Sequence, residues 1–229
     1  MEPKELAQAV HEKLLAYYGE PQWRSPLPPV AELASTILSQ NTNDTNRDRA
    51  FEALREKFPT WEEVRDADEQ AVIDAIRPAG LANQKGPRLQ QALREITAYN
   101  DGEISLDFLN DFSTQEAIDW LKDLKGVGPK TAAIVLLFAL GQPAFPVDTH
   151  VYRVTGRLGL RPAKMSAERA HLYLGELFPP DSYYAAHLNL IRLGREICHA
   201  RKPECPDCPL KEVCAYYTAN VAGKSTEKS

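Results

Sequence analysis

The sequence predicts an all-α protein in two lobes, for three reasons. Apolar residues recur at helical spacing, as at Leu6, Val10 and Leu14 in the first segment. No stretch alternates apolar and polar residues between turn signals, as the strands of a half-exposed sheet would. A Pro-rich segment, residues 20–29, follows the first helix and is typical of a linker that crosses from one lobe to another.

The remaining helices are predicted from the same spacing and from capping residues. Thr60 and Glu63 form a capping box. Asn43 or Asp44 is expected to cap the helix at 45–58, and Ser113 or Thr114 is expected to cap the helix at 114–124. The expected helices span residues 4–18, 30–38, 45–58, 60–64, 68–76, 114–124, 130–140, 149–158, 166–178 and 182–198, and one more runs from a Gly-marked loop at 79–86 to residue 99.

Length and composition set broad limits on the class of protein. The 229 residues suit one large domain or two small ones, with ample material for a core. Hydrophobic residues make up 43% and charged residues 26%, as in ordinary globular proteins. No apolar run approaches the roughly 20 residues of a membrane span. The start lacks the basic-then-apolar pattern of a secretory signal, so we expect a cytoplasmic protein.

The net charge of −5 argues against a nucleic-acid partner, but the charge is unevenly distributed. Residues 121–202 carry 12 Lys/Arg and 6 Asp/Glu, a net charge of +6, and the rest of the chain carries −11. A protein with one basic face can bind DNA by neutralising a few phosphates. The overall charge therefore does not exclude DNA as a partner.

Two glycines lie between helix-like segments in Leu124-Lys125-Gly126-Val127-Gly128-Pro129-Lys130-Thr131-Ala132. Glycine lets the backbone turn with positive φ and brings bare N–H groups close to an anion. Pro129 suits the first position of the next helix, whose N-terminal dipole favours a phosphate. Lys130 would then lie beside that phosphate. The alternative is that Lys130 is a solvated helix residue, since Gly-x-Gly before a helix is common.

A carboxylate follows in Val147-Asp148-Thr149-His150. A phosphate site, an amine and a carboxylate together suit chemistry on a nucleic-acid backbone. The alternative is that Asp148 only caps the helix that starts at Thr149. This stretch alone does not decide between the two.

Two more loops carry side chains suited to touching DNA. Ser39-Gln40-Asn41-Thr42-Asn43-Asp44 follows an apolar helix, and its amides could reach base edges, although a capping loop explains it equally well. Leu81 is expected at a loop tip, either as a core residue or as an apolar wedge in a base stack. Core packing is the more common fate of a leucine.

All the cysteines lie close together, in the spacing Cys198-x6-Cys205-x2-Cys208-x5-Cys214. This clustering indicates a metal centre rather than a distributed disulfide framework. One short step flanked by longer ones suits the separated corners of a [4Fe–4S] cluster better than the paired arms of a zinc site. Local disulfides are the least favoured alternative in a cytoplasmic chain. A bound cluster would present the nearby Arg201 and Lys202 to phosphates.

Taken together, these motifs resemble those of the endonuclease III family, DNA base-excision glycosylases of the helix-hairpin-helix superfamily. Residues 124–132 are similar to the family hairpin, residues 147–154 to its catalytic aspartate motif, and the cysteine spacing to its cluster signature. Leu38-Ser39-Gln40-Asn41 and Gly80-Leu81 resemble its two DNA-wedge loops. The resemblance extends from about residue 5 to 216.

The resemblance implies a two-lobed helix-hairpin-helix DNA glycosylase fold. A six-helix lobe, residues 24–142, would contain the hairpin. An iron–sulfur cluster lobe would combine residues 1–23 with 143–216, and a polar tail would span 217–229. DNA would lie across the cleft between the lobes, with the damaged base flipped out.

The implied activity is that of a bifunctional DNA glycosylase and AP lyase that removes oxidised pyrimidines. Lys130, in its neutral form, would attack C1′ of the damaged nucleotide and expel the base, and the resulting Schiff base would permit β-elimination. Asp148 would stabilise the positive charge on the sugar and assist the proton transfers. The implied DNA-contacting residues are Gln40, Asn41, Leu81, Lys125, Gly126, Gly128, Thr131, His150, Arg153, Arg201 and Lys202.

The resemblance also implies a cofactor, a partner and a location. The four cysteines would hold a [4Fe–4S] cluster. The partner would be duplex DNA with a damaged base or an abasic site, bound by a monomeric, cytoplasmic and nucleoid-associated protein. Two alternatives stay open: a mismatch glycosylase of the same fold, for uracil, thymine or adenine, and a non-catalytic DNA-structure-binding paralogue. Lys130 disfavours the first, because monofunctional relatives have another residue type there.

This sequence departs from the family pattern near the expected DNA contacts. Lys125 stands where proline is common, and Pro129 where a basic residue is frequent. Asn41 replaces the usual wedge glutamine, and Ala82 replaces a larger side chain. These departures bear on substrate range and efficiency rather than on the type of reaction.

Overall fold

The computed structural model describes residues 1–22 and 26–221, and all regular structure in those residues is helical. They form twelve α-helices joined by short 3₁₀-helices and one π-helical turn. The predicted all-α class is therefore confirmed. None of the helices in these residues has the length and apolar character needed to cross a membrane.

The chain divides into two compact units. One, here called the cysteine unit, combines Met1–Arg24 with Pro143–Ser229, and the other, the hairpin unit, is Ser25–Gln142. The chain passes between them within the predicted linker at residues 20–29, of which 23–25 lie outside the described residues. The predicted polar tail, 217–229, begins inside the last helix, and its residues 222–229 also lie outside the described part.

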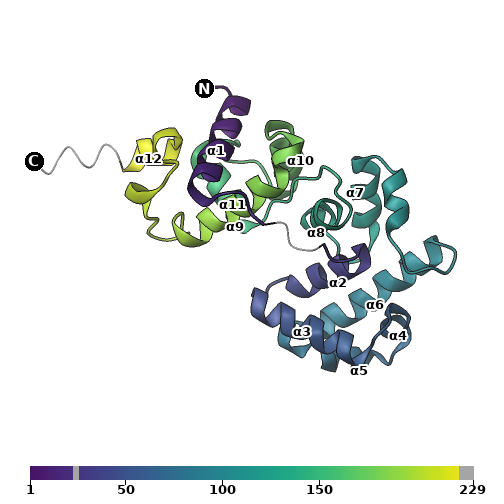
Figure 1. Ribbon diagram of the computed structural model, residues 1–229. Helices are drawn as coiled ribbons and strands as arrows, with labels where there is room; N and C mark the ends of the chain where they lie inside the picture. The colour runs from purple at the N-terminus through teal and green to yellow at the C-terminus, as the bar shows by residue number, and fades with distance from the viewer. Residues whose placement is uncertain (23–25, 222–229) are drawn as a thin grey trace, which may run out of the picture. The chain divides into compact units, whose positions relative to one another are not determined.

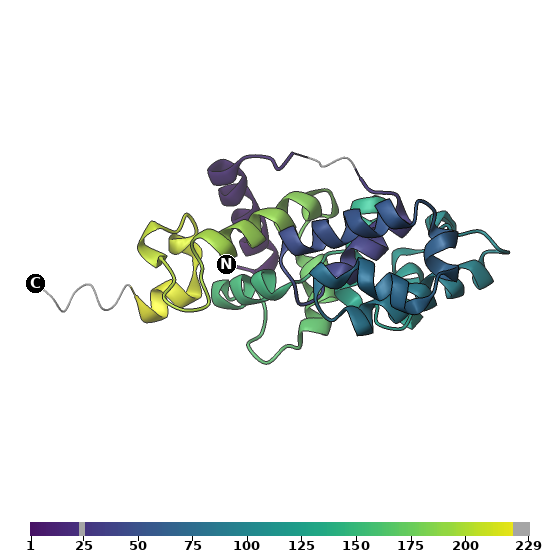
Figure 2. The ribbon, with the colours of Figure 1, turned by 90° about the horizontal axis from the view of Figure 1, so that it is seen from below.

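In the cysteine unit, the first helix packs among helices formed much later in the chain. Ala7, Val10 and Leu14 are fully buried on one face of α1, which lies beside α11 in both views (Figures 1 and 2). The helices of this unit are α1 (Pro3–Tyr18), α9 (Thr149–Leu158), α10 (Ala167–Leu177), η4 (Pro180–Ser182), α11 (Tyr183–Glu196), η5 (Cys205–Asp207), η6 (Lys211–Val213) and α12 (Ala215–Asn220).

In the hairpin unit, α6 is the longest helix and packs against α2, α4 and α5 (Figure 1). Its buried face is formed by Leu89, Leu93 and Ile96, at helical spacing. The helices of this unit are α2 (Pro29–Ser39), α3 (Asp44–Lys57), α4 (Trp61–Asp66), α5 (Glu69–Ala75), η1 (Arg77–Ala79), α6 (Ala82–Tyr99), η2 (Asp107–Asp111), α7 (Thr114–Asp123), α8 (Pro129–Ile134) and the π-helical η3 (Val135–Ala139).

The capping signals in the sequence act as expected. Thr60 and Glu63 make both bonds of the predicted capping box at α4. Asn43, rather than Asp44, caps α3, because its Oδ1 accepts the Asn46 N–H over 2.8 Å. Ser113 is the N-cap of α7.

Two helix boundaries differ from the prediction. The loop expected at 79–86 ends early, because α6 already begins at Ala82. Gly86 is a helix residue whose role is packing: a Cβ there would lie 3.0 Å from Cγ1 of Ile73 on α5. The helix expected at 130–140 is α-helical only to Ile134 and continues as the π-helical η3.

Candidate active site and cysteine centre

The turn between α7 and α8 buries its apolar residues and exposes its polar ones. Leu124 and Val127 are buried, and the Val127 N–H donates to the Leu124 carbonyl over 3.0 Å. Gly126 has a φ of +89°, and a Cβ there would lie 2.7 Å from Cδ of Arg88. Glycine is therefore needed both for the backbone conformation and for the arginine side chain packed against it. Lys125 is exposed.

Lys130 is exposed in the first turn of the helix that follows. Gly128 is the N-cap of α8 and Pro129 its first residue, as the sequence predicted. The N–H groups of a first helical turn have no carbonyl partner within the helix. One turn thus presents an amine together with backbone donors suited to an anion.

Thr131, predicted to contact DNA, has a side chain that is only 4% exposed. It is buried together with the two residues that follow it, Ala132 and Ala133, so this part of α8 is enclosed on more than one face. Its hydroxyl is therefore not available for the predicted DNA contact, and only the backbone N–H of Thr131 stays in that prediction.

Asp148 lies at the N-terminus of α9 in the cysteine unit, whereas Lys130 belongs to the hairpin unit. The Asp148 Oδ1 accepts the Val151 N–H over 2.7 Å, which confirms the capping role. Two histidines hold the buried segment that leads to it. His171 Nδ1 lies 3.1 Å from the Phe145 carbonyl, and His187 Nδ1 lies 2.9 Å from the Pro146 carbonyl.

The two predicted wedge loops both have exposed residues in left-handed conformations. Asn41 has a φ of +52° and Leu81 a φ of +50°. Leu81 is 49% exposed, which decides against the core alternative. Non-glycine residues in this conformation store strain and are concentrated at functional sites. Gln40 also ties the first loop to the hairpin, because its Nε2 donates to the Gly126 carbonyl over 3.0 Å.

Arg153 was predicted to contact DNA, and the structure places its guanidinium inside the cysteine unit. Its Nη2 donates to the Gly194 carbonyl over 2.7 Å and its Nε to the Cys198 carbonyl over 3.0 Å. The Gly194 carbonyl is one of the last four of α11, which lack helical donors, and Arg153 satisfies it. His150 Nδ1 lies 3.1 Å from the same Nη2, on a ring that is only partly exposed. Arg153 is therefore not retained as a DNA contact.

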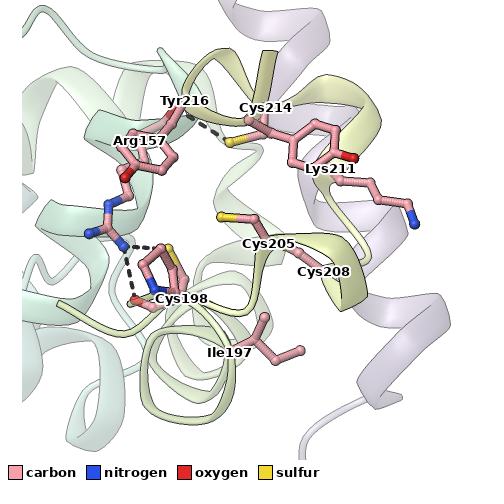
Figure 3. A pocket seen from close by; sticks show the side chains of 10 residues that line it. Arg157, Ile197, Cys198, Cys205, Cys208, Lys211, Cys214 and Tyr216 are labelled. Carbon is pink, nitrogen blue, oxygen red and sulfur yellow. Dashed lines mark hydrogen bonds between the residues drawn. The ribbon is translucent and has the colours of Figure 1, made fainter. Parts of the chain in front are cut away.

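The four cysteines are free thiols that line one cavity (Figure 3). Burial raises the pKa of Cys208 to about 11, and it raises the pKa values of Cys205 and Cys214 in the same direction. In residues 1–22 and 26–221, no three His, Cys, Asp or Glu side chains are gathered as ligands of a single metal ion. The thiols instead surround a shared space.

Arg157 also lines this cavity, although no motif in the sequence indicates it. Its Nη1 donates to the Cys198 Sγ over 3.2 Å and to the His199 carbonyl over 2.6 Å, and its Nη2 donates to the Ala200 carbonyl over 3.0 Å. Its guanidinium also lies 4.9 Å from the centre of the Tyr216 ring (Figure 3). The side chain brings a positive charge to the cavity. It also bonds the start of the loop from Cys198 to Cys205, here called the cysteine loop. Arg201 and Lys202 of that loop are exposed.

Comparison with known proteins defines the class. The family model described as "HhH-GPD superfamily base excision DNA repair protein" matches residues 34–180, more than half of the chain. Endonuclease III of Sulfolobus acidocaldarius is 35% identical over 193 residues, which cover 83% of each chain. The thymine-DNA glycosylase of Aeropyrum pernix is 30% identical over 224 residues, covering 92% of this chain and 95% of that protein.

Among solved structures, a trapped endonuclease III–DNA covalent intermediate matches with a TM-score of 0.80 at 28% identity, covering 96% of this chain and 99% of that one. The chain belongs to the endonuclease III family of base excision DNA repair proteins. It is accordingly an enzyme of the DNA glycosylase/AP lyase class, and the resemblance seen in the sequence is confirmed.

Proposed function

We propose that this protein removes oxidised pyrimidines from duplex DNA and then cuts the strand through a Schiff base on Lys130. The observation that carries the proposal is the exposed Lys130 in the first turn of α8, directly after the glycine turn. A lysine so placed is a nucleophile next to a backbone suited to a phosphate.

The reaction begins when the neutral Nζ of Lys130 attacks C1′ of the damaged nucleotide. An Nζ–C1′ bond forms, and the bond from C1′ to the base breaks with its electron pair leaving on the base, which takes up a proton. Opening of the sugar ring gives the imine. Loss of a proton from C2′ then expels the 3′ phosphate oxygen with its electron pair, and hydrolysis of the imine frees the lysine.

Asp148 is the proposed carboxylate partner. It would stabilise the positive charge that develops on the sugar and accept protons in the later steps. Its capping bond, which uses Oδ1, is compatible with this role because a carboxylate has acceptor sites on both oxygens.

The proposed DNA contacts come from both units, and most of them are exposed or half-buried. Gln40, Asn41 and Leu81 belong to the two wedge loops, and Arg201 and Lys202 to the cysteine loop. The proposed set also includes Lys125, Gly126, Gly128, His150 and the Thr131 N–H. The proposed partner is a duplex with a damaged base or an abasic site, and we propose that the protein binds it as a monomer in the cytoplasm, in association with the nucleoid.

We also propose that Cys198, Cys205, Cys208 and Cys214 hold a [4Fe–4S] cluster. The donor set fits, because four thiols share one cavity whose burial disfavours thiolates unless positive charge compensates them. A bound cluster would supply that charge and fix the loop carrying Arg201 and Lys202. Iron and sulfide analysis tests this: four of each per chain are expected, and one zinc with no iron would contradict it.

Borohydride trapping tests the lysine mechanism. The protein is incubated with a duplex containing thymine glycol, and borohydride is added to reduce the imine to a stable amine. A covalent protein–DNA band is expected with the native protein and none with Lys130→Gln. Lys57→Gln, which changes an exposed lysine on α3 of the same unit, should leave the band intact. An undiminished band with Lys130→Gln would refute the proposal.

A mismatch glycosylase is the second candidate, because the Aeropyrum pernix relative is a thymine-DNA glycosylase. The same assay with thymine opposite guanine distinguishes the two. Release of thymine that survives Lys130→Gln, with no band on the oxidised substrate, would favour the mismatch activity. Binding without release of any base would favour the non-catalytic paralogue.

A further inference from the structure

Lys85 is a buried lysine that the proposed reaction does not use. Its side chain is 1% exposed, although it lies in the first turns of α6 among polar residues. Its Nζ donates to the Leu38 carbonyl and to the Ala79 carbonyl, each over 2.8 Å. One ammonium group therefore bridges two segments that are distant in the sequence.

Both acceptors lie directly before the tips of the two wedge loops. Leu38 is in the last turn of α2, three residues before Asn41. Ala79 ends η1, two residues before Leu81. Asn41 and Leu81 are the exposed left-handed residues of these loops. Lys85 thus joins the backbone segments that lead into the two tips.

Both electrostatics and burial favour the bridge that Lys85 makes between the two carbonyls. Carbonyls at the end of a helix lack helical donors and carry partial negative charge, which favours a cation there. No basic residue lies in the last turn of α2, so Lys85 supplies that charge from α6. Burial lowers the pKa of Lys85, because the charged form is poorly solvated. A buried ammonium is tolerated only where its hydrogen bonds are made, so displacement of either loop is disfavoured.

The same face of α6 also supports the hairpin. Arg88 lies one turn after Lys85, and its side chain packs against Gly126. Gln40 joins the first loop to the Gly126 carbonyl. Through Lys85 and Arg88, α6 therefore supports both wedge loops and the catalytic hairpin.

We propose that Lys85 is a positioning residue that fixes the tips at Asn41 and Leu81 relative to each other, so that both engage DNA as the damaged base is extruded. The proposal rests on the proposed function. Extruding a paired base requires unpairing and unstacking, which an abasic site largely avoids. Loss of Lys85 should therefore impair base excision much more than strand cutting at an abasic site already present.

The test compares two rates on one preparation of each protein. One duplex carries thymine glycol, and an otherwise identical duplex carries a preformed abasic site. Lys85→Met keeps the length of the side chain and removes its donors. Its ratio of excision to cleavage should fall by about 10²-fold, the size of effect expected from a misplacement of about 1 Å. A loss of folded protein lowers both rates equally and leaves the ratio unchanged.

Gln90→Met is the matched control. Gln90 is also a buried polar residue of α6, 1% exposed, and its Nε2 bonds the Val64 and Ala67 carbonyls over 2.9 Å instead of the loop ends. Its ratio should match that of the native protein. Lys85→Gln, which keeps a shorter donor, should give an intermediate ratio and replaces Lys85→Met if that variant does not fold.

An unchanged ratio in the Lys85 variants would overturn the proposal, as would an equal fall in Gln90→Met. Native protein that processes neither duplex would instead refute the proposed function, and the role of Lys85 would fall with it.

Discussion

The hairpin unit and the cysteine unit position their functional residues by different means. In the hairpin unit, protein groups fix the loops: Lys85 bonds the ends of α2 and η1, and Gln40 bonds Gly126. In the cysteine unit, Arg157 bonds the start of the segment from Cys198 to Cys214, but the rest of that segment consists of short 3₁₀ turns whose thiols line a cavity. The loops of the first unit are fixed by its own polar side chains, whereas the second would also depend on the cluster proposed for its thiols.

Cys208→Ser should have the largest effect and should confine it to one unit. Metal binding contributes folding free energy, about 10 kcal/mol for structural zinc sites, so loss of a ligand of the proposed cluster should destabilise the cysteine unit by several kcal/mol. Calorimetry should show an early transition for that unit and an unchanged one for the hairpin unit. Glu212→Gln, which breaks an exposed ion pair with Lys13, should cost less than about 1 kcal/mol. Native-like melting of Cys208→Ser would remove the contrast between the units.

Arg157→Met should be the next largest change, because Arg157 bonds the carbonyls of His199 and Ala200 at the start of the cysteine loop. The variant removes the charged donor of the hydrogen bonds to the His199 and Ala200 carbonyls. The free energy of unfolding should therefore fall by about 3 kcal/mol. Urea unfolding measures the difference. Arg169→Met, at an exposed position on α10, should stay within about 0.5 kcal/mol. Equal effects of the two variants would show that the loop does not depend on Arg157.

Gly126→Ala should destabilise the hairpin unit by about 2 kcal/mol, from the positive φ and the contact with Arg88. Gly128→Ala should cost less than about 1 kcal/mol, since its φ is −101° and no atom lies within 4 Å of an added Cβ. Adding Arg88→Ala to Gly126→Ala should recover only the part of the lost stability that comes from the contact with Arg88. Full recovery in the urea midpoint would mean that the backbone conformation is not strained.

The smallest expected effect is a pH dependence from Lys85. Its pKa in the folded protein is below the ordinary value of 10.5, so between these two values the unfolded chain binds a proton that the folded protein does not. The free energy of unfolding of the native protein, relative to Lys85→Met, should therefore rise with pH across this window. Urea unfolding from neutral to alkaline pH measures it. The difference in unfolding free energy between the native protein and Gln90→Met should not rise with pH. A fall with pH in the difference between the native protein and Lys85→Met would contradict a lowered pKa for Lys85.

The sequence by itself determined the features that depend on near neighbours. The capping box at Thr60, the cap at Asp148 and the first-turn proline Pro129 act within one helical turn, so local spacing was enough to find them. The glycine turn with Lys130 and the cysteine spacing were also readable, because each is a short motif. Together they gave the fold class and the family. The proposed roles of Lys130, Asp148 and the cysteines stay predictions until they are tested.

Only the tertiary structure decided which polar side chains face inward. Lys85 lies in a polar stretch and reads as solvated, yet its acceptor at Leu38 is 47 residues away. Arg157 meets Cys198 across 41 residues, and Arg153 turns toward α11 rather than outward. Leu81 is exposed although leucines are mostly buried. Burial of a polar side chain depends on which distant segments meet it, and local spacing does not show which segments those are.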